Sequence, residues 1–320
     1  MSPASDGRSA VLPIPHGPLP VFAVLALSLI GISFAGPLVR LSSAHPIAIA
    51  VWRLAFSLVL ISVPLIFSRG WRQWRLLGVR NAALAGGAGV MLALHFWSWN
   101  TAVGMTSIAA AVVLVNVQPL IVGVVSATWL KEAPGNRQWV GIGIAMIGAI
   151  VVASPDLKGS AGLLENRALL GDLLAFAGAV TAALYYLSGR RLRQTLDIWP
   201  YVALVYGACF LTLLLIAGLL RVPLAPQPPS EIAIFAALAV GPMLLGHTGM
   251  NWALKYLPAY VVNLTTLGEP IGATLLAAVL PGIREIPPAV TLIGGAIVLT
   301  GIAVALPKAN GGNGSVTKNE

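Results

Sequence analysis

An internal repeat constrains the fold of this chain more than any other feature. The motif Trp-Asn-Thr-Ala at 99–102, followed by Gln118-Pro119, returns as Met-Asn-Trp-Ala at 250–253, followed by Glu269-Pro270. With small changes in offset, further residues match between the copies: Pro46 with Pro200, Gly141 with Gly294 and Gly148 with Gly301. Each copy holds five hydrophobic stretches. If each stretch crosses a membrane, an odd number places the second copy upside down relative to the first, which predicts an inverted repeat.

The composition places these stretches in a membrane. Hydrophobic residues make up 58% of the 320 residues and charged residues only 9%, and the mean hydropathy is +0.88. So few charges cannot coat a soluble globule of this length, which indicates an all-α, multi-pass membrane protein. A helix needs roughly 20 apolar residues to cross a ~30 Å hydrocarbon core. We predict ten transmembrane helices, at 19–39, 46–67, 81–103, 107–130, 138–153, 170–189, 201–220, 232–254, 259–280 and 289–306.

The net charge of +9, from 19 basic and 10 acidic residues, is a topology signal. With a cytoplasmic N-terminus, the inner segments hold 13 basic residues and the outer loops hold 5, while Arg53 lies inside a helix. This bias fits the positive-inside rule. It predicts a protein of the plasma or inner membrane with both termini in the cytoplasm, surrounded by lipid. Charge distributed in this way is not the footprint of a nucleic-acid partner.

The predicted helices divide the chain into five segments. They are a cytoplasmic N-terminal segment (1–18), the first five-helix repeat (19–153), a loop between the repeats (154–169), the second repeat (170–306) and a disordered cytoplasmic tail (307–320). No loop is long enough to hold a soluble domain. The function of the protein must therefore be carried out within the membrane.

This pattern resembles the EamA-type branch of the drug/metabolite transporter superfamily. The resemblance covers residues 20–306 and rests on the two groups of five helices, on Arg53 early in the second helix, on a proline in the fourth and ninth helices (Pro119 and Pro270), and on an acidic residue after each of those helices (Glu132 and Glu285). It implies a basket of helices around a central substrate cavity. It also implies alternating access, commonly for export of amino acids, their relatives or other small metabolites.

Glu269 is the first candidate for substrate binding or coupling. It lies near the middle of the predicted ninth helix, where a charge costs ~2.5–3.5 kcal/mol on insertion scales. In a functional role it would face the cavity and bind a cationic group or take up a proton, which makes the proton a candidate coupling ion. In a structural role it would hydrogen-bond Thr265 or backbone groups freed by Pro270. Gln118, at the equivalent position, shows that an uncharged amide also fits there.

Arg53 lies eight residues into the predicted second helix. A guanidinium suits the binding of a substrate carboxylate through two parallel hydrogen bonds. The structural alternative is a buried ion pair or a bond to a carbonyl that fixes helix packing. Gly207 occupies the equivalent position of the second repeat, and the sequence leaves both alternatives open.

Further polar side chains recur at corresponding places in the two repeats. His95 and Trp99 share one helix face, and His247 and Asn251 repeat that spacing. A histidine can titrate between pH 5 and 8 and so couple transport to protons. Such residues either line the cavity or join helices by hydrogen bonds worth ~0.6 kcal/mol each. The remaining candidates of this kind are Asn100, Asn116, Gln118, Tyr185, Asn263 and Thr266.

Three function classes remain after this reasoning. The leading one is a secondary transporter of small amphipathic metabolites; a flippase for a lipid-linked headgroup shares its fold class. The third, a membrane-embedded enzyme, lacks a recognisable catalytic set in the sequence, so we expect no catalytic residues. No phosphate-binding loop, thiol pair or set of metal ligands is evident in the sequence, with Cys209 as the single cysteine. We therefore expect neither cofactor nor metal.

Overall fold

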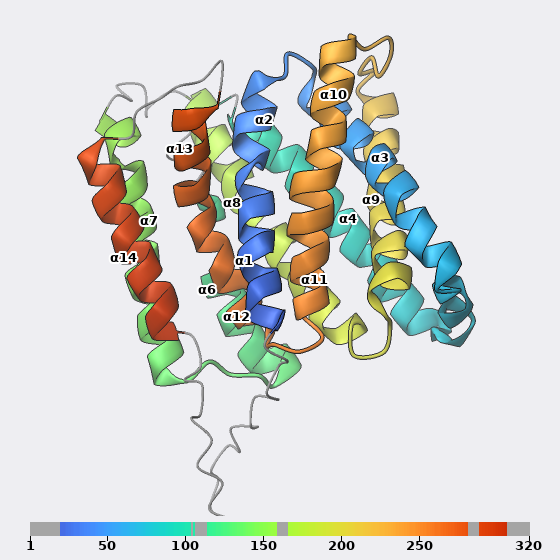
Figure 1. The fold of residues 1–320 in the computed structure, drawn as a ribbon, viewed down its shortest axis with the longest axis horizontal. Coiled ribbons are helices and arrows are strands. Elements are labelled where there is room, and N and C mark those ends of the chain that lie inside the picture. The colour runs from blue at the N-terminus through green and yellow to red at the C-terminus, as the bar shows by residue number, and fades with distance from the viewer. Residues whose placement is uncertain (1–19, 104, 106–113, 159–165, 281–287, 306–320) are drawn as a thin grey trace, which may run out of the picture.

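A computed structural model describes residues 20–103, 105, 114–158, 166–280 and 288–305. All regular structure within these ranges is helical (Figure 1), which agrees with the predicted all-α class. The predicted terminal segments 1–18 and 307–320 lie outside the described residues. Glu285 and the first part of the predicted fourth helix also lie outside them.

The first half of the chain contains these elements: α1 (Pro20–Ser33), α2 (Ala35–Leu41), α3 (Pro46–Phe67), the 3₁₀ turn η1 (Gly70–Leu76), α4 (Gly78–Val103), α6 (Gln118–Val125), the π-helical turn η2 (Ser126–Leu130) and α7 (Asn136–Lys158). The bounds of α3 agree with the predicted second helix. Pro46 occupies its first turn, where a missing N–H costs nothing, and His45 Nδ1 accepts from the Ile47 N–H at 3.2 Å.

The second half contains α8 (Asn166–Leu192), α9 (Ile198–Leu219), α10 (Pro229–Leu238), the π-helical segment η3 (Ala239–Thr248), α11 (Gly249–Ala253), α12 (Ala259–Leu264), the 3₁₀ turn η4 (Thr265–Gly268), α13 (Glu269–Val279) and α14 (Ala289–Ala305). The predicted eighth helix therefore contains a π-helical segment around Pro242. The predicted ninth helix is interrupted by η4 immediately before Pro270, because proline has no N–H to continue the helical bonding.

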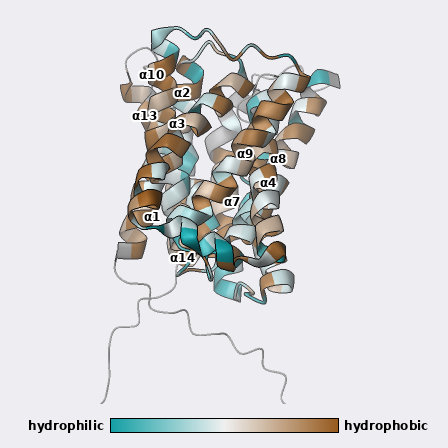
Figure 2. Ribbon diagram, turned by 90° about the vertical axis from the view of Figure 1, so that its right-hand side faces the viewer, coloured by the Kyte–Doolittle hydropathy of each residue, from teal (hydrophilic) through white to brown (hydrophobic). Residues whose placement is uncertain are grey.

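Within the described residues, six helical segments are long and apolar enough to cross a bilayer: Val21–Leu41, Pro46–Phe67, Gly78–Ala102, Leu169–Leu192, Ile198–Leu219 and Pro229–Ala253. Gln118–Leu130 and Ala289–Ala305 are shorter apolar helices. Large apolar side chains such as Leu215 and Leu299 point outward, and Figure 2 shows hydrophobic residues over the length of many helices. A bilayer accommodates such a surface, so the protein is a multi-pass membrane protein.

Small residues join α7 to α14, which lie side by side at one edge of the molecule (Figure 1). A β-carbon added at Gly141 would lie 2.6 Å from the Gly301 carbonyl oxygen, and one at Gly148 would lie 2.9 Å from the Gly294 oxygen. The two backbones therefore touch, as small-residue seams in membrane helices allow. Residue numbers rise along one helix as they fall along the other, so the pair is antiparallel.

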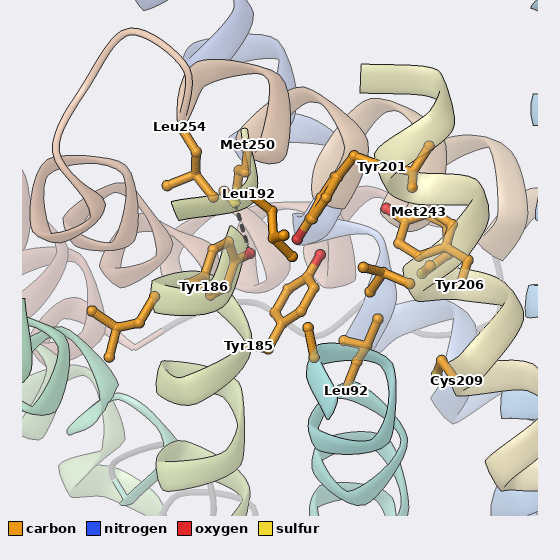
Figure 3. Packing of buried hydrophobic residues seen from close by; sticks show 14 of the residues in the cluster. Leu92, Tyr185, Tyr186, Leu192, Tyr201, Tyr206, Cys209, Met243, Met250 and Leu254 are labelled. Carbon is orange, nitrogen blue, oxygen red and sulfur yellow. Dashed lines mark hydrogen bonds between the residues drawn. The ribbon is translucent and has the colours of Figure 1, made fainter. Parts of the chain in front are cut away.

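The remaining helices pack in corresponding pairs. Helix α4 packs against α8 and α9, α1 against η3, α3 against α9, and α6 against α12. Tyrosines fill the region between α8, α9 and α4, where Tyr185, Tyr201 and Tyr206 are fully buried among Leu92 and Met243 (Figure 3). This packing brings the polar residues of the two halves together.

Candidate functional site

Arg53 is buried between the two halves of the chain, with 3% of its surface exposed. Its guanidinium carbon lies 4.1 Å from the centroid of the Phe96 ring, and Nη2 donates to Met243 Sδ at 2.9 Å. The Phe96 ring attracts the Arg53 guanidinium, but the Nε–H of Arg53 has no acceptor among the described residues.

A set of neighbouring rings extends from Phe96 in α4 to His247 and Tyr186 in the second half of the chain. Phe96 meets the His247 ring edge to face at 5.6 Å between centroids, and His247 stacks with Tyr186 at 6.5 Å. The His95 ring also lies 5.4 Å from the Phe96 ring, centroid to centroid, and its Nδ1 lies 3.0 Å from the Gly178 carbonyl. A carbonyl only accepts, so Nδ1 carries the proton of this bond. His247 Nδ1 has no partner among the described residues.

Tyr185 and Asn251 form the next part of the same region. The Asn251 Nδ2 donates both to the Tyr185 hydroxyl and, at 2.6 Å, to the His247 carbonyl. Asn251 is fully buried, yet its Oδ1 accepts nothing from the described residues. Tyr185 is also fully buried and lies 4.8 Å from Tyr186, ring centroid to ring centroid.

Glu269 begins α13, directly after the 3₁₀ turn η4. It is half-buried and interacts electrostatically with Arg53 and Tyr186. No described residue gives its carboxylate a hydrogen bond or an ion pair. Thr265 donates instead to the Val262 carbonyl at 2.6 Å, so the Thr265–Glu269 bond considered as a structural alternative is absent. We use the term inter-repeat cluster for Arg53, His95, Tyr185, His247, Asn251 and Glu269.

The other predicted residues occupy the neighbourhood of α4 and the α6–α12 contact. Asn100 donates to the Pro46 carbonyl at 3.4 Å, while its Oδ1 and the Trp99 Nε1 lack partners among the described residues. Gln118 and Asn263, on the contacting helices α6 and α12, likewise carry unpaired amide atoms. Asn116 is buried, and Thr266 donates to the Asn263 carbonyl at 2.7 Å.

Sequence reasoning missed several members of this region. Phe96, Met243 and Tyr206 were not predicted, yet two of them contact Arg53 and the third bonds Thr248 through its hydroxyl at 3.0 Å. Phe96 directly follows His95, which is the one signal that could have drawn attention to it. No group of three metal-ligating side chains occurs among the described residues.

Glu132, which formed part of the family resemblance, lies outside this cluster. Its carboxylate pairs with Arg190 at 2.7 Å, and Arg190 also donates to the Leu254 carbonyl at 2.6 Å. The pair therefore joins the end of η2 to the end of α8 and to the connection after α11. Its role in this structure is to hold three chain segments together.

Partly unpaired polar groups that both halves of a helical membrane protein contribute are typical of the substrate site of a small-molecule transporter. Comparison with known proteins then identifies its family. The sequence profile of the EamA-like transporter family matches residues 19–154 and again 169–306, so the chain belongs to this family. The predicted resemblance is confirmed.

Named relatives agree with this assignment. The chain is 25% identical over 274 residues to the uncharacterized transporter YyaM of Bacillus subtilis (strain 168), covering 83% of this chain and 87% of that protein. It is 23% identical over 316 residues to the inner membrane protein YtfF of Escherichia coli (strain K12), covering 89% and 94%. These names and the family indicate a transporter of small molecules rather than an enzyme.

A solved structure shares the fold. A crystal structure with 19% sequence identity superposes with a TM-score of 0.71 and covers 89% of this chain and 96% of its own. At this identity the likeness concerns the fold alone. The arrangement of helices described above is therefore one that an experimentally determined protein also adopts.

Proposed function

We propose that this protein is a secondary transporter that exports amino acids or related amphipathic metabolites by alternating access. The observation that carries the proposal is the inter-repeat cluster. A buried polar atom without a partner costs about 1–3 kcal/mol, and the region around the cluster has several, including Arg53 Nε, His247 Nδ1 and Asn251 Oδ1. A bound substrate with its own donors and acceptors would satisfy such atoms.

The chemistry of the cluster favours a substrate with charged and apolar parts. Arg53 would bind a carboxylate, Glu269 would bind an amino group or exchange a proton, and the rings of Phe96, Tyr186 and His247 would contact an apolar side chain. The unpaired atoms of Trp99, Asn100, Gln118 and Asn263 would provide further hydrogen bonds, with Asn116 and Thr266 beside them. In this proposal all of these side chains face one central cavity.

The proposed transport cycle rests on ten transmembrane helices in two inverted repeats, residues 19–153 and 170–306, with both termini in the cytoplasm. The antiparallel contact of α7 with α14 supports this arrangement. Gly141 meets Gly301, the repeat equivalent of Gly148, and Gly148 meets Gly294, the repeat equivalent of Gly141. The paired contacts of α4 with α8 and of α1 with η3 are also those that a twofold axis would interchange. Rocking of one repeat against the other would then expose the cluster to each side in turn.

Flux through liposomes tests the function. The purified protein is reconstituted, and uptake of a panel of radiolabelled amino acids, aromatic compounds and cationic drugs is measured with and without a pH gradient. We expect uptake of selected members above that of empty liposomes. Absence of flux for every member would contradict the proposal and favour the lipid-linked substrate of a flippase.

Reporter fusions test the topology independently. Fusions after Arg80 and after Arg193 are expected to report a cytoplasmic position, and a fusion after Lys158 a position on the opposite side. A fusion after Arg193 that reports the outer side would contradict the proposed count of helices.

A further inference from the structure

Two hydrogen-bonded sets join the repeats at opposite ends of the molecule. One contains Ser42 and Ser43, between α2 and α3, and Glu231 in the first turn of α10. The other contains Gln73 in η1, together with Asp197 and Lys255. In Figure 1 the start of α10 lies at one end of the helices, and the lower end of α3, where η1 follows, lies at the other. In the orientation proposed above, these are the outer latch and the inner latch.

The two latches use the same bonding pattern. In the outer latch, the Ser43 N–H donates to Glu231 Oε1 at 2.8 Å, and the Ser43 hydroxyl donates to the same oxygen at 2.9 Å. In the inner latch, the Asp197 N–H donates to Gln73 Oε1 at 3.0 Å, and Gln73 Nε2 donates to Asp197 Oδ2 at 2.6 Å. In each case one residue uses both its backbone N–H and its side chain to bind a single partner in the other repeat.

The latches also occupy corresponding positions in the repeats. Ser43 lies three residues before Pro46, and Asp197 lies three residues before Pro200, the repeat equivalent of Pro46. Their partners correspond as well. Gln73 lies just before α4, the third helix of the first repeat, and Glu231 lies in the first turn of α10, the third helix of the second repeat. A twofold axis relating the repeats would therefore exchange one latch for the other, although the residue types differ.

The surroundings of the two latches differ in a way that affects their strength. Glu231 is 4% exposed and also accepts from the Ser42 hydroxyl. The side chains of Asp197 and Lys255 are 60% and 41% exposed, and they pair at 3.3 Å. Hydrogen bonds shielded from water are the stronger ones, whereas exposed ion pairs contribute little. The outer latch therefore holds more firmly than the inner one.

We infer that the two latches hold the repeats together at each end of the substrate route, and that they open in alternation during transport. Glu231, Ser43, Gln73 and Asp197 act as positioning residues, since none belongs to the inter-repeat cluster. The inference rests on the proposed alternating-access function. Alternating access requires that one end opens while the other stays closed, and duplicated contacts at symmetric places meet this requirement.

Spin-label distances test the inference without any substrate. In a Cys209→Ala background, one pair of labels at exposed Leu41 and Ser230 reports on the outer end, and a second pair at exposed Arg72 and Gln194 reports on the inner end. We expect Glu231→Ala to increase the longer-distance population at the outer pair only, with a change in the closed-to-open ratio of at least about tenfold, because it removes the carboxylate that accepts all three hydrogen bonds of the outer latch. Gln73→Ala should increase the longer-distance population at the inner pair only.

Matched controls remove one hydrogen bond from the same connections without touching a latch. Gln227→Ala breaks a bond to the Leu224 carbonyl in the outer connection, and Thr195→Ala breaks a bond to the Leu192 carbonyl in the inner one. Both should leave the distances unchanged. If Glu231→Ala does not fold, Ser43→Ala removes the Ser43 hydroxyl from the outer latch while its backbone N–H and the Ser42 hydroxyl still donate to Glu231, and it should shift the distances in the same direction by a smaller amount.

Unchanged distances in the latch variants, or equal changes in the controls, would overturn the inference. Flux measured on the unlabelled wild-type protein separates this failure from that of the proposed function. A wild-type protein that transports while the latch variants leave the distances unchanged refutes the latches alone. Distances that shift in a protein without flux leave the latches standing and refute the transport proposal.

Discussion

The guanidinium carbon of Arg53 lies 4.1 Å from the centroid of the Phe96 ring, so a positive charge on α3 is held against an aromatic ring on α4. The arrangement needs the planar guanidinium, because an ammonium group cannot both lie over the ring and present a hydrogen-bonding fork. The charge and the geometry of Arg53 can therefore be tested separately.

We predict that Arg53→Lys weakens binding of carboxylate substrates, since it keeps the charge but loses the two parallel hydrogen bonds that a guanidinium can donate. The loss should be about 1.5–3 kcal/mol, the size of one hydrogen bond to a charged group, and should appear as a higher KM in the liposome assay. Arg221→Lys, at an exposed position, serves as the control. Equal KM values for wild type and Arg53→Lys would show that the guanidinium does not contact the substrate.

Glu269→Gln tests proton coupling. Because the amide cannot take up a proton, we expect the variant to lose flux driven by a pH gradient while it retains exchange of labelled for unlabelled substrate. Gln118 at the equivalent position indicates that an amide is accommodated without loss of folding. Gradient-driven flux at the wild-type rate would remove Glu269 from the coupling mechanism.

Gly148→Val should destabilise the protein through the α7–α14 contact. A β-carbon at this position would lie 2.5 Å from the Val298 backbone nitrogen, whereas one at Gly143 would meet no atom within 4 Å. We expect a loss of roughly 1–3 kcal/mol, typical of overpacking, seen as a lower midpoint of thermal unfolding in detergent. Gly143→Val should unfold near the wild-type temperature, and equal effects would contradict the described packing.

The inner latch should weaken in acid. The hydrogen bond from Gln73, with further help from Lys255 and the charge of Arg193, holds the pKa of Asp197 below its usual value. A lowered pKa means that the stabilising contribution is complete above the ordinary carboxyl pKa and is lost as the pH falls through the lowered one. The longer-distance population at the inner label pair should then grow with acidification, and Asp197→Asn should abolish this dependence.

Several members of the candidate site could be picked out before the fold was known. Arg53, Glu269 and the histidines stood out because ionisable groups are costly in a hydrocarbon core. Phe96 and Met243 did not, since an apolar side chain in an apolar helix carries no signal of its own, and only the neighbouring His95 could have pointed to Phe96. The local breaks at η4 and η3 follow from Pro270 and Pro242. The bond from Thr265 to Glu269, one of the structural alternatives for Glu269, does not form, because Thr265 bonds the Val262 carbonyl of its own preceding turn.

The sequence by itself determined the membrane class, the family and the α3 bounds, because these depend on hydropathy, on repeated motifs and on local proline and capping geometry. Only the tertiary structure decided which polar groups meet and which remain unpaired. It placed Glu231 with Ser43 and Gln73 with Asp197 across the two repeats. Such partners are far apart in the chain, and their pairing is set by how the helices pack rather than by any local pattern of residues.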